Sequence, residues 1–265
     1  MNNSSEPIDF SQLPDVSDGY PDPEEQWLAE STAHELARYN ALRFIFGETY
    51  PEDSVLETKD PDLLFNWIGG CVVCFPPQAN RKSWYYVTHG LAQPFGEDDY
   101  MPAILADYLD YRDMNDEEAL SGWGIELVVS TRDFYDWVPE LLLSLVRYLL
   151  FAEGSQIILP GHRLPLGSSI DSAAEPGLNH LLAVTNPEYP STIRLPGGLC
   201  SLIHLIGVTE AEVKHARTLE GGRGSLVLQR VLEKLGVGCL TDPDRSCVTT
   251  HPQFEQAWQE AESKV

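Results

Sequence analysis

The chain has 265 residues, 41 acidic and 17 basic, and its formal net charge at pH 7 is −24. A surface this negative repels phosphate, which argues against nucleic acids and anionic membranes as partners. It attracts basic protein surfaces, but the same charge also favours solubility, and composition leaves both interpretations open. With 43% hydrophobic residues, the chain can bury a sizeable core without disulfides or a metal.

The sequence predicts a cytoplasmic protein. Residues 1–25 contain seven acidic and no basic residues and have no apolar stretch, unlike a signal peptide. No apolar run in the chain reaches the length that spans a membrane. The odd number and irregular spacing of the five cysteines are not those of a secreted disulfide framework. The cysteines are Cys71, Cys74, Cys200, Cys239 and Cys247.

The first elements follow an acidic N-terminal arm. Residues 1–24 are rich in Ser, Asp, Pro and Asn, which predicts a flexible or loosely docked segment. Apolar residues then recur at helical spacing and predict one helix over residues 24–47, ending near Gly47. A second, short helix is expected over residues 60–67, with Asp60 and Pro61 at its start.

A strand-rich stretch comes next. Short apolar or aromatic runs predict strands over residues 71–75, 84–88 and 125–130, the last preceded by a turn at residues 121–124. Residues 97–118 hold nine acidic residues and one arginine, so we expect an acidic surface segment there.

The clearest helix is expected over residues 139–151, where leucines and valines form a broad apolar face after Pro139. Thr209 and Glu212 have the spacing of a capping box and predict the start of another helix. The other expected elements are strands over residues 156–159, 181–184, 192–195 and 199–207, helices over 209–217 and 224–235, a hairpin of 237–240 with 247–249, and a C-terminal helix around Phe254 and Trp258. Strands and helices without regular alternation predict an α+β fold, a mixed or antiparallel sheet with flanking helices.

No chemical motif supports catalysis or a cofactor. Cys71 and Cys74 are three apart on an expected strand, so their thiols face opposite sides and cannot bind one ion. His204 lies in an apolar run and is interpreted as a core histidine. The glycines of residues 220–225 are followed by no Gly-Lys-Ser/Thr, so we interpret them as a loop before a helix. We therefore predict no enzyme, no metal and no cofactor, with an unrecognised hydrolase or metal enzyme as an alternative.

Several segments together resemble the suppressor-of-fused domain over roughly residues 40–250. The segments that carry the resemblance are Trp84–Leu91 with Phe95–Asp98, Ser121–Leu127, Trp137–Leu141 running into Val146–Leu150, Pro160–His162, Leu181–Thr185, Leu205–Thr209 and Cys239–Pro243. The resemblance implies an α+β domain over residues 25–250, like the N-terminal domain of that family, and a C-terminal helix or tail over residues 251–265. It also implies no known catalytic chemistry.

The resemblance further implies protein binding. Animal members of the family sequester Gli-type transcription factors by adding a short peptide as a strand. Tyr148 matches a tyrosine of that peptide site, and Pro160-Gly161-His162 stands where the family has Gly-Asp-His. The resemblance therefore implies that the aspartate that reads the peptide's histidine is either replaced by Gly161 or shifted by a one-residue insertion. The candidate partner-binding residues are Tyr148, His162, Arg163, Glu97, Asp98 and Asp99, the last three from the acidic segment.

Bacterial members are similar to immunity proteins of polymorphic toxin systems. The first hypothesis is therefore a cytoplasmic immunity protein that neutralises a cognate, basic toxin domain. The alternative is a regulatory scaffold that sequesters an endogenous peptide or transcription factor by strand addition.

Overall fold

The computed structural model describes residues 8–11, 23–48, 55–57, 59–61, 63, 67, 70–93, 119–152, 155–170 and 177–265, with the backbone alone over 23–31 and 55–57. The helices are α1 (Pro23–Phe46), α4 (Trp137–Phe151), α5 (Glu210–Ala216), α6 (Arg223–Lys234), the 3-10 helix η1 (Val248–Thr250) and α7 (Phe254–Glu262). The strands are β1 (Ile8–Asp9), β2 (Val55–Glu57), β3 (Cys71–Phe75), β4 (Trp84–His89), β5 (Leu120–Thr131), β6 (Arg163–Pro165), β7 (His180–Val184), β8 (Thr192–Leu195) and β9 (Gly198–Val208).

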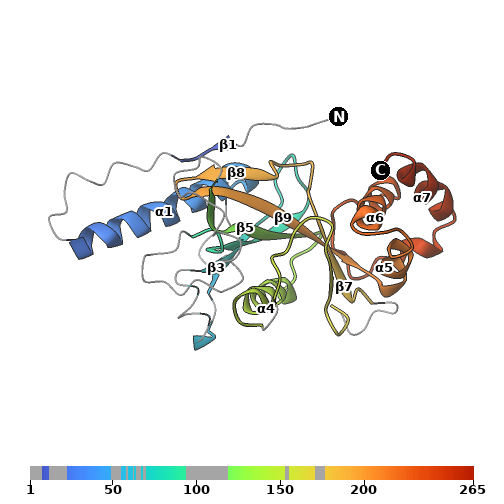
Figure 1. Ribbon diagram of the computed structural model, residues 1–265, viewed down its shortest axis with the longest axis horizontal. Helices are drawn as coiled ribbons and strands as arrows, with labels where there is room; N and C mark the ends of the chain where they lie inside the picture. The colour runs from blue at the N-terminus through green and yellow to red at the C-terminus, as the bar shows by residue number, and fades with distance from the viewer. Residues whose placement is uncertain are drawn as a thin grey trace.

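These strands form one mixed sheet in the described part of the chain. Their order is β1-β8-β9-β5-β4-β3-β2, and β7 also pairs with β9 and carries β6 on its other side (Figure 1). The pairing of β5 with β9 and of β1 with β8 is parallel, and the other pairings are antiparallel. The long strand β9 can pair with both β8 and β7 because its first half pairs with β8 and its second half with β7.

Helices cover both faces of the sheet (Figure 1). Alternate strand residues point to opposite faces, so β7 sends Leu181 and Ala183 into the core under α4. Leu182 and Val184 of the same strand enter a second core with α5, α6 and α7. A third core lies between α1 and the β3–β5 part of the sheet. The predicted α+β class, a mixed sheet with flanking helices, is thereby confirmed.

The helix predictions are confirmed wherever apolar periodicity and capping carried them. Helix α4 matches the expected 139–151 segment, and α1 ends one residue before Gly47. At the start of α5, Glu212 N–H donates to the Thr209 hydroxyl at 3.3 Å, and Thr209 N–H donates to Glu212 Oε2 at 2.8 Å. This is the predicted capping box. The C-terminal helix packs Phe254 and Trp258 into the core with α5 and α6.

Three local predictions are wrong. Residues 121–124 are not a turn before β5 but lie inside it. The pairing register shifts between Leu120 and Ile125, and Gly122 and Gly124 take positive φ, so the segment is an irregularity within the strand. Residues 156–159 are not a strand; the segment pairs with no strand there and packs Ile158 beneath α4.

The third wrong prediction is the C-terminal hairpin. Leu240 makes one isolated bridge with Ser130 of β5, and residues 248–250 form the 3-10 helix η1. The physical reason is that the Glu212 carboxylate accepts a hydrogen bond from the Val248 N–H at 2.8 Å, which holds this segment against α5.

Some predictions fall on residues outside the described ranges. These are most of the 1–24 arm, residues 62 and 64–66 of the 60–67 helix and the whole acidic segment 97–118. Of the arm, residues 8–11 are described, and β1 pairs with β8. Among the described helices, none combines the length and apolar character needed to cross a membrane.

Candidate functional site

Helix α4 has two apolar sides. Leu142, Val146 and Leu149 are fully buried against the sheet, as the heptad-like spacing of a core-facing helix requires. A second strip, Trp137, Leu141 and Tyr148, recurs at intervals of four and seven residues and so lies along another side. Tyr148 is 38% exposed. The core therefore covers this second strip only in part.

Strand β6 faces this strip, and one of its two edges pairs with no other described strand. Ala183 N–H of β7 donates to the His162 carbonyl at 2.9 Å, and Leu166 N–H donates to the Asn179 carbonyl at 3.0 Å. In an antiparallel pair, alternate residues bond to the neighbour, so the backbone groups of Arg163 and Pro165 point away from β7. Proline has no N–H to leave unpaired, which suits it to an edge. Within the described residues, β6 pairs with β7 alone.

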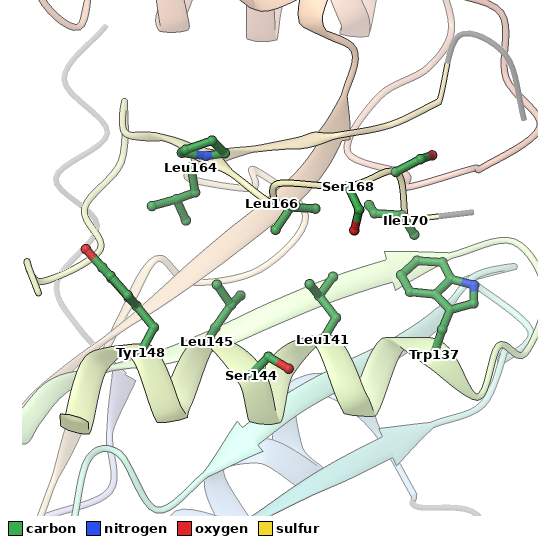
Figure 2. A pocket seen from close by; sticks show the side chains of 11 residues that line it. Trp137, Leu141, Ser144, Leu145, Tyr148, Leu164, Leu166, Ser168 and Ile170 are labelled. Atoms are coloured by element: carbon green, nitrogen blue, oxygen red, sulfur yellow. The ribbon is translucent and has the colours of Figure 1, made fainter. Parts of the chain in front are cut away.

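A groove of about 500 Å³ runs between α4 and β6. Its walls are Trp137, Leu141, Ser144, Leu145 and Tyr148 from α4, and Leu164, Pro165, Leu166, Ser168, Ser169 and Ile170 from β6 and the segment after it. Figure 2 shows the two rows of side chains facing each other, with Tyr148 opposite Leu164 at one end and Trp137 near Ile170 at the other. The groove is therefore mainly apolar, with serine hydroxyls along it.

A second hollow of about 660 Å³ continues the groove at the Tyr148 end. It shares Tyr148, Leu164 and Pro165 with the groove, and the rest of its wall is Gln156, Pro160, Gly161, His162, Arg163, Arg217, Gly221 and Gly222. The wall is fixed by two contacts between distant segments. The Ser225 hydroxyl donates to the Gly161 carbonyl at 2.7 Å, and Arg163 Nη2 donates to the Gly221 carbonyl at 3.2 Å.

The second hollow is basic. Burial lowers the pKa of Arg163, and the nearby positive charge of Arg217 lowers that pKa further. His162 Nδ1 accepts the Leu159 N–H at 3.4 Å, so in the neutral ring Nε2 carries the proton and can donate. The groove is thus apolar along most of its length and cationic at the Tyr148 end.

Three of the six candidate residues come together here. Tyr148, His162 and Arg163 all line the second hollow, while Glu97, Asp98 and Asp99 lie outside the described residues. Their roles in binding remain predictions. Gly161 has φ +95°, a conformation that favours glycine, so the local backbone gives a reason for glycine at this position.

Sequence reasoning missed most of the groove. The broad apolar face predicted for α4 includes the second strip, but the sequence does not predict the opposite wall of the groove. That wall is the segment from Leu164 to Ile170, which has no strong strand pattern. Arg217 was missed because it lies 54 positions from Arg163 in the chain, as the numbering shows (217 − 163).

Other polar groups are enclosed in the core. Cys71 and Cys74 enter different cores on opposite sheet faces, as predicted. His204 is fully buried and contacts the Cys239 carbonyl at 2.8 Å and the Tyr189 hydroxyl at 2.8 Å, as expected of a satisfied core histidine. In the described part of the chain, no group of three His, Cys, Asp or Glu side chains is placed to hold a metal ion.

The mixed sheet has α4 on one face, and α1 and α5–α7 cover different parts of the other. This arrangement defines an α+β domain of the suppressor-of-fused type. The family model described as "Suppressor of fused protein (SUFU)" matches residues 68–246, more than half of the sequence, and the chain belongs to this family. No curated protein matches it.

Two solved structures show the same fold. One is "the Sufu-Fu complex crystal structure", with a TM-score of 0.58 and 18% identity, covering 84% of this chain and 94% of that one. The other is Drosophila Suppressor of Fused, with a TM-score of 0.54 and 20% identity over 74% of this chain. The match spans 46% of the Drosophila chain, so the chain corresponds to less than half of that protein.

Proposed function

We propose that this chain is a protein-binding domain that holds an extended segment of a partner along the free edge of β6, in the groove against α4. The observation that carries the proposal is an open strand edge beside an apolar groove. Arg163 offers an N–H and a carbonyl to a new strand, and Pro165 offers a carbonyl. Every second side chain of the added strand would enter the apolar groove. That a protein of this fold is found in the Sufu–Fu complex supports the proposal.

The groove can be tested by blocking it. Ser144 is exposed on α4 and lines the groove, and its hydroxyl donates to the Glu140 carbonyl one turn earlier. Ser144→Arg would fill the groove without disturbing the core. Ser263→Arg is the matched control, because Ser263 is also exposed and donates to the Glu260 carbonyl, at the end of α7.

The experiment selects peptides of about 12 residues from a random display library on the wild-type protein. We expect selected peptides to bind the Ser263→Arg protein normally and the Ser144→Arg protein at least about tenfold more weakly, a loss of about 1.4 kcal/mol. Calorimetry measures both affinities, and equal melting temperatures establish that both variants are folded. Peptides that bind the Ser144→Arg variant as tightly as the wild type would refute the groove proposal.

The finer proposal concerns the partner. The net charge of −24 favours a basic protein, because charge complementarity steers association and raises its rate. We propose neutralisation of a basic toxin domain as the role, with sequestration of an endogenous peptide or transcription factor as the alternative. Co-expression with toxin domains encoded beside the gene tests this. Survival of the cells supports the immunity role, and failure to bind or protect against any of them removes it.

A further inference from the structure

The cationic end of the groove is unusual in so acidic a chain. Arg163 is on β6, and Arg217 directly follows α5; both line the second hollow. The sequence has 41 acidic residues, and several arginines elsewhere in the described structure are paired with one of them. Arg245 binds Glu212 at 2.6 Å, and Arg132 lies 3.5 Å from Asp242.

Arg163 and Arg217 form no such pair within the described residues. Nη1 of Arg163 is buried and has no hydrogen-bond partner there, whereas Nη2 is held by the Gly221 carbonyl. The positive charge of Arg217 repels that of Arg163 and, together with burial, lowers the pKa of Arg163. Glu210 of α5 is already engaged, by His180 at 3.3 Å and by Lys214 at 3.6 Å.

The wall around the two guanidinium groups leaves room for a ligand. Gly161, Gly221 and Gly222 contribute no side chains to it, and a Cβ added at Gly221 or Gly222 would meet no atom within 4 Å. At Gly161 the first atom met would be the Gly222 Cα, at 3.9 Å. A group that enters this space lies beside Arg163, which lines the hollow.

We propose that the second hollow binds the carboxylate of an Asp or Glu side chain in the partner segment that occupies the groove. The two hollows share Tyr148, Leu164 and Pro165, so a strand added to β6 passes from one to the other. A carboxylate accepts two parallel N–H bonds from a guanidinium and offsets the repulsion between two of them. This inference rests on the proposed function, and it gives that function a specificity: apolar residues followed or preceded by an acid.

The test uses the peptides selected on the wild-type protein. Each peptide is synthesised again with its Asp and Glu residues changed to Asn and Gln, and both forms are titrated against the wild type and the Arg163→Gln/Arg217→Gln double variant. Arg230→Gln is the control, because Arg230 is an exposed arginine of α6 that lines neither hollow and its loss also removes a positive charge. Melting temperatures check that all variants are folded.

We expect the Asn/Gln form of a peptide to bind the wild type and the Arg230→Gln protein about tenfold more weakly than the original peptide does. The double variant should bind both forms of the peptide with equal affinity. Peptides that are blocked by Ser144→Arg but insensitive to neutralisation would overturn the carboxylate site and leave the groove proposal standing. An equal loss of the acid preference in Arg230→Gln would show a long-range charge effect and would also overturn it. Peptides that bind the Ser144→Arg variant as tightly as the wild type would refute both proposals.

Discussion

Glu126 makes the stability of this protein depend on pH in a direction opposite to that of most carboxylates. It is 2% exposed on β5, on the sheet face that α1 covers. Burial raises its pKa from 4.5 to about 7, although three hydrogen bonds favour the charged form. Oε1 accepts the N–H groups of Gly90 and Ala92, each at 2.9 Å, and Oε2 accepts the Thr88 hydroxyl at 2.6 Å.

The size of the effect follows from the two pKa values. Between pH 4.5 and 7 the folded chain keeps a proton on Glu126 that the unfolded chain has lost, so raising the pH favours unfolding. The stabilisation is fully present below pH 4.5 and is lost as the pH rises through 7. At about 1.4 kcal/mol per pKa unit, the loss between pH 5 and pH 8 is about 2.5 kcal/mol.

The assay is urea unfolding of the wild type and of Glu126→Gln across this pH range, because glutamine keeps the shape and cannot titrate. We expect the wild-type free energy of unfolding, measured relative to the variant, to fall by about 2.5 kcal/mol from pH 5 to pH 8. His89 and His204, whose pKa values burial lowers to about 4, titrate in both proteins and cancel in the difference. Glu140→Gln, at an exposed site on α4, is the control. A difference that stays constant with pH would refute this reasoning.

Two further predictions concern stability. Burial alone would raise the pKa of Glu212, but two hydrogen bonds at 2.6 Å from Arg245 lower it, so Glu212→Gln should reduce the unfolding free energy by about 3 kcal/mol, as measured by urea unfolding at pH 7. A loss below about 1 kcal/mol would show that the buried pair contributes little. Gly161→Ala should destabilise the fold by about 1–2 kcal/mol because of its φ of +95°, whereas Gly222→Ala, at φ −78° and with equally open space, should change it by less than about 0.5 kcal/mol; equal losses in a thermal melt would contradict the backbone argument.

The groove shows where local patterns stop being informative. Its α4 wall was predicted because leucines at helical spacing fix a helix and its buried side without knowledge of the rest. Its β6 wall is not predicted: the apolar run indicates a strand over residues 156–159, and the structure has none there. The actual strand contains Pro165, which weakens any strand prediction. It forms because β7 offers an edge to pair with, and that depends on contacts across the sheet.

The sequence by itself determined the α+β class, most helices and strands, the capping box of α5 and the likeness to the suppressor-of-fused domain, because each rests on residues close together in the chain or on a pattern kept in order. The tertiary structure decided which edge of β6 is unpaired among the described strands, that Arg163 and Arg217 line the same hollow, and that Glu126 is buried under α1. Pairing, burial and electrostatic environment are set by neighbours that are distant in sequence, and local propensity carries no information about them.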